Sequence, residues 1–134
     1  MENYNLPATD ANLIIVVDDD SAVRNSLKFS LELEGFAVRT YACGEDLLNE
    51  AAFPSCRCLV VDEKLPGISG IDLIARLRGQ KVIAPAILIT THPSATLRSR
   101  AADAGIPIVE KPLLGGTLFE CIHGAMISSP GQRY

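Results

Sequence analysis

Five short apolar runs, each followed by a stretch with helical periodicity, constrain the fold of this chain more than any other feature. The runs occupy residues 13–17, 36–40, 58–61, 86–90 and 106–109. Apolar runs of this length are typical of buried strands, and strands that alternate with helices predict a parallel sheet with right-handed crossovers. We therefore expect an α/β fold, a doubly wound five-stranded parallel sheet with helices on both faces.

The helices carry recognisable signals at their ends. Val23, Leu27 and Leu31 recur every four residues, as on one face of an amphipathic helix. Asp20 or Ser21 is suited to cap this helix, and Gly35 to end it. Further helices are expected at 45–51, at 71–78 closed by Gly79, at 95–104 closed by Gly105, and around Leu118, Ile122, Ala125 and Met126.

Composition sets the broad class of the protein. The chain has 134 residues, 48% of them hydrophobic, which predicts one domain that buries a core without disulfides or a structural metal. A net charge of -4 with scattered lysines and arginines disfavours direct binding to nucleic acid or to an acidic membrane. No segment approaches the ~18 apolar residues of a membrane span, and a secretory signal pattern is missing, so we expect a cytoplasmic protein.

The cysteines fit neither a CxxC redox motif nor a common zinc spacing. In a reducing compartment they are expected to stay thiols. Cys56 and Cys58 alternate at the entry to an apolar run, so we expect both sulfurs on the same face of a strand, packed rather than bound to metal. The full set is Cys43, Cys56, Cys58 and Cys121.

Acidic residues follow two of the predicted strands. Asp18, Asp19 and Asp20 come directly after the first run, and Asp62 comes after the third. In a sheet of order 2-1-3-4-5 the binding site lies beyond the carboxyl ends of strands 1 and 3, which are neighbours ~4.8 Å apart. Asp62 should therefore converge with Asp18 and Asp19. Like charges ~5 Å apart repel by about 3 kcal/mol at an effective dielectric of ~20, so this site should attract a cation.

Two further residues arrive at the same edge of the sheet. Thr90 ends the fourth run and Lys111 follows the fifth. A cluster of carboxylates suits a hard cation, and Mg²⁺ is the candidate because one or two carboxylates, waters and phosphate oxygens usually hold it. Taken singly, each residue has an ordinary explanation: Asp20 as a helix cap, Asp62 in a turn, Thr90 as a strand former and Lys111 as a solvated lysine. Their shared edge favours one site.

The motifs VVDDD, VVDEKLPGISG, ILITTH and VEKP, in this order, resemble the receiver domain of two-component response regulators. The stretches GFAVRTY and EKP are most similar to receivers of nitrogen-fixation transcription regulators, which normally precede a LuxR-type helix-turn-helix. The resemblance implies a flavodoxin-like fold and a receiver domain at 12–127. We expect an N-terminal extension at 1–11, a C-terminal tail at 128–134, no output domain, and a natural single-domain regulator.

The resemblance also implies a role for each residue of the site. Asp62 would accept a phosphoryl group from a phosphohistidine, Lys111 would pair with the phosphoryl oxygens, and the Thr90 hydroxyl would donate to one of them. Mg²⁺ would be bound by Asp19 directly, by Asp18 mainly through water, by Asp62, and by the backbone carbonyl of Lys64. A cis peptide bond is implied between Lys111 and Pro112.

The implied partners are a sensor histidine kinase or phosphotransfer protein and a downstream protein target, with a possible homodimer through the face formed by residues 95–104 and 106–109. No nucleic acid or membrane partner is expected.

Ile108 stands where most receivers have Tyr or Phe, which leaves partner recognition at this face open. Thr91 is bulkier than the usual residue. Lys64 and His92 flank the phosphoryl site, and Lys64 is either a modulator of phosphoryl lifetime or a solvated loop lysine.

Two other functions compete with this one. An aspartate-nucleophile phosphatase carries DxD followed by Thr or Val; Asp18 and Asp20 have that spacing, but Ser21 follows and no lid-sized insertion is present. A phosphorylation-independent interaction module is the second alternative. Under the receiver interpretation the protein is not an enzyme, apart from self-catalysed phosphoryl acceptance and autodephosphorylation.

Overall fold

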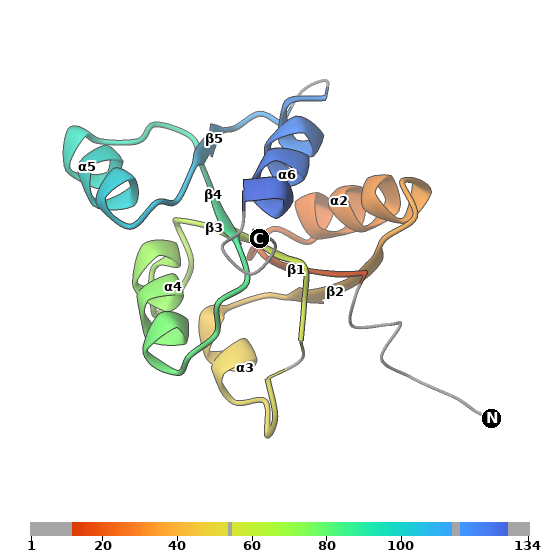
Figure 1. The fold of residues 1–134 in the computed structure, drawn as a ribbon, viewed down its shortest axis with the longest axis horizontal. Helices are drawn as coiled ribbons and strands as arrows, with labels where there is room; N and C mark the ends of the chain where they lie inside the picture. The colour runs from red at the N-terminus through yellow and green to blue at the C-terminus, as the bar shows by residue number, and fades with distance from the viewer. Residues whose placement is uncertain (1–11, 54, 114–115, 129–134) are drawn as a thin grey trace.

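A computed structural model describes residues 12–53, 55–113 and 116–128 (Figure 1). Its five strands form one parallel sheet in the order β2-β1-β3-β4-β5, which confirms the predicted fold class and strand order. The strands are β1 (Leu13–Val17), β2 (Ala37–Tyr41), β3 (Cys58–Asp62), β4 (Ala86–Thr90) and β5 (Ile108–Glu110).

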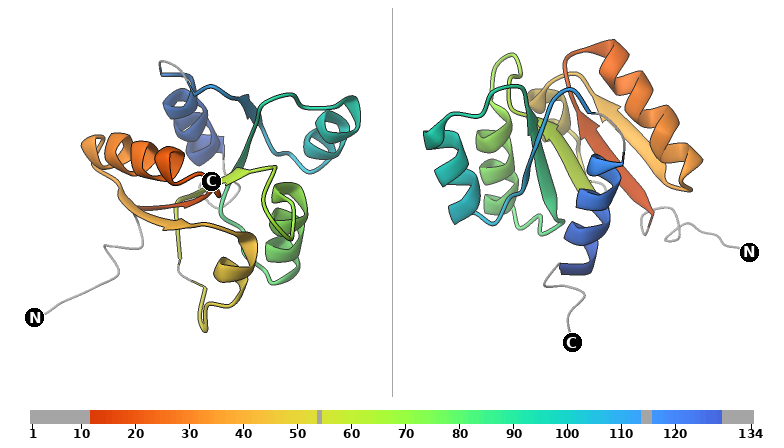
Figure 2. Two further views of the ribbon diagram at one scale, coloured as in Figure 1. Left: turned by 180° about the vertical axis from the view of Figure 1, so that it is seen from behind. Right: turned by 90° about the horizontal axis from the view of Figure 1, so that it is seen from above.

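Helices cover both faces of the sheet, as Figure 2 shows. They are α2 (Ser21–Leu33), α3 (Gly44–Leu48), α4 (Gly70–Gly79), α5 (Ala95–Asp103) and α6 (Thr117–Ser128). Helices α3, α4 and α5 pack on one face, while α2 and α6 pack on the other. Within the described residues, no helix combines the length and the apolar character that crossing a membrane requires.

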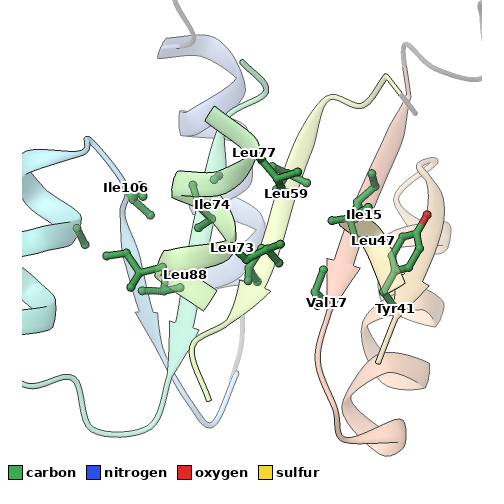
Figure 3. Close-up of a cluster of buried hydrophobic side chains, with 14 of the residues drawn as sticks. Ile15, Val17, Tyr41, Leu47, Leu59, Leu73, Ile74, Leu77, Leu88 and Ile106 are labelled. Atoms are coloured by element: carbon green, nitrogen blue, oxygen red, sulfur yellow. The ribbon is translucent and has the colours of Figure 1, made fainter. Parts of the chain in front are cut away.

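Because helices cover both faces, the central strands are apolar along their whole length. Every residue of β1, β3 and β4 is buried. Side chains alternate between the faces: Ile15 packs toward α3, α4 and α5 with the cluster drawn in Figure 3, whereas Ile14 and Val16 pack toward α2 and α6. The sheet is therefore a rigid base whose carboxyl edge carries the site.

The helix ends explain where the strands begin. After α2, the Phe36 N–H donates to the Leu31 carbonyl at 3.1 Å, with Gly35 in the left-handed region as predicted. After α5, the Ile106 N–H donates to the Ala101 carbonyl at 2.8 Å in the same way. Because these N–H groups close the helices, β2 begins one residue and β5 two residues later than the apolar runs indicated.

The prediction that Gly79 closes α4 was wrong. Gly79 is the last residue of the helix, and Lys81 takes the left-handed conformation with φ of 69°. The Val82 N–H donates to the Leu77 carbonyl at 3.0 Å, so the helix ends in the same capping motif two residues further on. The helix expected at 45–51 is also shorter, because α3 ends at Leu48.

The four cysteines are free thiols, but the expected arrangement of two of them was wrong. Cys56 packs against the cluster on the α3, α4 and α5 side, while Cys58 belongs to the cluster under α2 and α6. The alternation of side chains starts only where β3 starts, at Cys58, so it does not extend back to Cys56. Burial raises the pKa of both thiols to about 12, which fits packing roles.

Gly70 is held by the strand end that carries Asp62. A Cβ atom at Gly70 would lie 2.3 Å from the Asp62 carbonyl oxygen and 2.8 Å from the Glu63 Cα, both backbone atoms. We expect Gly70→Ala to lower the free energy of unfolding by about 2 kcal/mol, since overpacked sites typically cost this much. Gly79→Ala is the matched control: nothing lies within 4 Å, and the change should raise stability by about 0.5 kcal/mol. Urea unfolding measures both changes. Equal effects of the two substitutions would contradict the close packing of Gly70 against the end of β3.

Candidate functional site

Three carboxylates meet at the carboxyl edge of the sheet. Strands β1 and β3 are paired neighbours, and their ends carry Asp18 and Asp62 side by side. One ligand oxygen from each of Asp18, Asp19 and Asp62 lies within 4.8 Å of the others. The structure thus brings together the three acids that the sequence pattern expected to converge. Asp18 and Asp62 are buried, and Asp19 is exposed.

Asp18 is fixed by its own backbone and by its neighbour. Its N–H donates to the Tyr41 carbonyl at 3.1 Å, which continues the line of β1 for one residue. Its Oδ1 accepts a hydrogen bond from the Asp20 N–H at 2.9 Å. Of the two expected caps, Asp20 is the one that caps α2, and its side chain accepts from the Ala22 N–H at 2.9 Å.

Lys111 supplies the positive charge of the cluster. Its Nζ lies 3.1 Å from Asp18 Oδ2 and 3.3 Å from Asp62 Oδ2, and its side chain is 22% exposed. The Lys111 N–H donates to the Thr90 carbonyl at 2.8 Å, and the Lys111–Pro112 peptide bond is cis, as the resemblance implied. Burial lowers the pKa of the Lys111 ammonium, but the opposing contributions of Asp18 and Asp62 outweigh it and raise the pKa overall.

Asp62 is the carboxyl whose ionisation the site disfavours. Burial and the negative charge of Asp18 raise its pKa above the ordinary value. Two groups act against this rise: the Lys111 ammonium, and the Lys64 N–H, which donates to Asp62 Oδ1 at 3.3 Å. The carboxyl is therefore ready to gain stability from any added positive charge.

The donor set fits a hard divalent cation. Asp18 Oδ2 is buried and accepts no hydrogen bond from the described residues, because Lys111 Nζ approaches it as an ion pair only. Within the described part of the chain, the cluster has three carboxyl groups and one ammonium, which pairs with Asp18 and Asp62, so negative charge is in excess. Carboxylate oxygens are the ligands of Mg²⁺, which commonly keeps several waters beside one or two of them. Asp18, Asp19 and Asp62 are the residues that would hold it.

The remaining predicted residues differ in their exposure and in their contacts with this cluster. Thr90 is buried at the end of β4, and its backbone carbonyl joins it to Lys111. Lys64 contributes its backbone N–H, while its side chain is exposed. Thr91 and His92 are exposed beyond β4, and Ile108 is half-buried in β5.

Two glutamates that were not among the predicted site residues hold the loop between β3 and α4. Glu63 Oε1 accepts from the Ile71 N–H at 2.9 Å in the first turn of α4, and Glu45 Oε2 accepts from the Ile68 N–H at 3.0 Å. Burial raises the pKa of Glu63, although the Ile71 N–H opposes it. Glu63 could have been considered from the sequence, because it lies seven residues before the start of α4, close enough in the chain to bind that helix's first turn. Glu45 had none, because 23 residues separate it from its partner.

Comparison with known proteins shows the family of this chain. The family model described as "Response regulator receiver domain" matches residues 14–123. The C4-dicarboxylate transport transcriptional regulatory protein DctR of Rhodobacter capsulatus is 33% identical over 120 residues, covering 87% of this chain and 61% of that protein. The transcriptional regulatory protein FixJ of Rhizobium meliloti is 35% identical over 111 residues, covering 82% and 54%.

A solved structure gives the same fold. The CheY-like receiver domain protein from Methanospirillum hungatei superposes with a TM-score of 0.83 at 25% identity, covering 92% of this chain and 99% of that one. The chain thus spans nearly all of a solved single domain, but 61% and 54% of the two curated regulators above.

Proposed function

This chain belongs to the response regulator receiver domain family, and from that premise we propose that it is a phosphoacceptor switch with Asp62 as the residue that takes the phosphoryl group. The observation that carries the proposal is the position of Asp62 Oδ2, 3.3 Å from Lys111 Nζ and within the cluster formed with Asp18 and Asp19. Asp18 is the other buried carboxylate beside Lys111, but its Oδ1 already accepts a hydrogen bond from the Asp20 N–H, which favours Asp62 as the acceptor.

Phosphoryl transfer requires a nucleophilic oxygen and stabilisation of spread negative charge. An ionised Asp62 oxygen attacks phosphorus, and the bond from phosphorus to the donor breaks. The electron pair of that bond leaves with the imidazole of a phosphohistidine, or with acetate from a small donor. Lys111, already paired with Asp62, stays beside the oxygens that arrive with the phosphoryl group.

Asp18, Asp19, Asp62 and the carbonyl of Lys64 are the groups that would hold Mg²⁺. When bound, the ion would neutralise charge on the phosphoryl oxygens. The chain's own share of this work is to keep Asp18 buried and oriented through the Asp20 N–H, and to hold the β3–α4 loop with Glu45 and Glu63. The first contact holds one oxygen of Asp18, and the other two hold backbone N–H groups of the segment that follows Asp62.

The acyl phosphate adds about two negative charges at the edge of the sheet. The Thr90 hydroxyl at the end of β4 is the proposed donor to this group, and its movement would carry residues 91–94 and α5 with it. Arg98 of α5 pairs with Glu110 of β5 at 2.9 Å, so a shift of α5 would change the surface at β5. This surface, with Ile108 in place of the usual aromatic residue, is the proposed output and possible dimer face.

The proposed partners follow from the reaction. A sensor histidine kinase or a phosphotransfer protein would supply the phosphoryl group, and a downstream protein would recognise the altered α5 and β5 surface. The protein itself would catalyse only acceptance and hydrolysis of its own phosphoryl group. Its curated relatives DctR and FixJ are named as transcriptional regulators, which makes control of transcription the proposed setting.

Incubation with acetyl phosphate and Mg²⁺, followed by intact mass measurement, tests this function. We expect one phosphoryl group per chain, and none when a chelator removes divalent cations. The group should be labile to base, as an acyl phosphate is and a phosphoserine is not at the same pH. Protein that stays unmodified in the presence of Mg²⁺, or that is labelled equally with and without the chelator, would contradict the proposal.

A further inference from the structure

Arg24 contacts the acidic cluster from outside it. This residue closes the first turn of α2, and its Nη1 donates to the carbonyl oxygen of Asp18 at 2.8 Å. The pairing of β1 with both of its neighbours ends at Val17, so the Asp18 carbonyl lies beyond the sheet ladder. Among the described residues the Arg24 guanidinium is the one recorded donor to this oxygen.

The Asp18 carbonyl belongs to the peptide unit that joins Asp18 to Asp19. Because a peptide unit is planar, fixing its oxygen also fixes the direction in which the chain enters Asp19. The Asp18 carboxylate is separately held through its Oδ1 by the Asp20 N–H. The side chain of Asp18 and the peptide that leads to Asp19 are thus held by different donors. Figure 2 shows α2 lying along the strands whose ends carry these residues.

We propose that Arg24 is a positioning residue, which orients the Asp18–Asp19 peptide so that both carboxylates face Asp62 and can bind a divalent cation together. The inference rests on the proposed function, since it concerns the cation that phosphoryl acceptance requires. Arg24 touches neither the cation nor the phosphoryl group. It acts through the backbone carbonyl of Asp18.

A simple charge effect would have the opposite sign. A guanidinium near three carboxylates lowers the local negative potential, so removing it would strengthen cation binding if charge were all that mattered. Removing a residue that orients the carboxylates would weaken binding instead. The direction of the change therefore separates the two roles. A purely structural role would lower thermal stability and leave the cation affinity of the folded protein unchanged.

The experiment is isothermal titration calorimetry of the unphosphorylated full chain with Mg²⁺. We expect Arg24→Met to weaken binding about tenfold, the size of one hydrogen bond to a charged group. Lys28→Met is the matched control: it removes the same charge from the same helix, and the one ion pair of Lys28 with a described residue is with exposed Glu32. Its affinity should stay within about twofold of wild type. Wild-type or tighter binding by Arg24→Met would overturn the inference.

Arg24→Lys provides a second variant if the methionine variant does not fold. Lysine keeps the charge but lacks the planar fork that reaches the carbonyl, so binding should be about threefold weaker than wild type. Wild-type affinity in this variant would overturn the inference. Asp19→Asn separates this result from failure of the proposed function. If wild type binds Mg²⁺ and Asp19→Asn does not, the function stands whatever Arg24 does; if wild type binds no Mg²⁺, both fall.

Discussion

Replacement of Asp62 by asparagine is expected to abolish phosphoryl acceptance. The amide oxygen of asparagine has nearly the same shape but carries no charge and is a poor nucleophile, so acetyl phosphate with Mg²⁺ should leave the intact mass of Asp62→Asn unchanged. The variant should still fold. The Lys64 N–H can donate to the amide oxygen as it does to Oδ1, and Lys111, which loses its hydrogen bond to Asp62 Oδ2, keeps its ion pair with Asp18.

Asp20→Asn is the matched control for this change. Asp20 neighbours the cluster in sequence, but its exposed side chain caps α2, and asparagine caps helices as well as aspartate does. This variant should accept one phosphoryl group as wild type does. Full labelling of Asp62→Asn, or loss of labelling in Asp20→Asn, would be inconsistent with Asp62 as the acceptor.

For Asp62→Asn we also expect a change in how stability depends on pH. The folded-state pKa of Asp62 is raised above the ordinary 3.8, so the native state holds this proton more tightly than the unfolded state does. Stability should therefore fall as pH rises from about 4 through the raised pKa. Asp62→Asn lacks this titration and should be the more stable protein at pH 7 without divalent cations. Urea unfolding over a pH series measures both curves.

Replacement of Lys111 by methionine should produce the largest loss of stability. Lys111 is the only described cation within ion-pair distance of Asp18 and Asp62, and both carboxyl groups are buried. Removing one partner of a buried ion pair typically costs 3–5 kcal/mol, so we expect the free energy of unfolding to fall by about 3 kcal/mol at pH 7 without Mg²⁺. The loss should shrink when Mg²⁺ is added and when the pH is lowered enough to protonate Asp62.

Lys64→Met controls for the removal of a lysine near the site. The Lys64 side chain is exposed, and its backbone N–H, which contacts Asp62, is retained. Its unfolding free energy should change by less than about 0.5 kcal/mol, as for most exposed substitutions. If Lys111→Met were as stable as Lys64→Met, or if Mg²⁺ failed to narrow the difference, the electrostatic account of the cluster would be wrong.

The sequence predicted most of the sheet because buried strands carry a strong signal. The bounds of β1 and β4 match their apolar runs, and the predicted order followed from the repetition of strand–helix units. Errors arose where hydrogen bonds, not hydropathy, decide a boundary. Ile106 is apolar enough for a strand, but its N–H closes α5; Lys81 takes the left-handed position that Gly79 was expected to fill.

The site shows the same division. Asp18, Asp62 and Lys111 were predictable because parallel strands end at one edge, so residues far apart in sequence share a place that topology fixes. Arg24 and Glu45 were not, because a side chain that binds a backbone group leaves no spacing pattern in the sequence. The distance between partners, 6 residues for one and 23 for the other, depends on how the helices pack. Support of this kind becomes visible only in the folded structure.

Mapping the phosphoryl group in the labelled protein tests the central claim most directly. Borohydride reduces an aspartyl phosphate to homoserine, with release of phosphate, and leaves free carboxylates intact. After labelling with acetyl phosphate and Mg²⁺, reduction and peptide mass analysis, the account predicts homoserine at position 62. Homoserine at position 18 or 19, or a labelled protein in which position 62 remains aspartate, would contradict it.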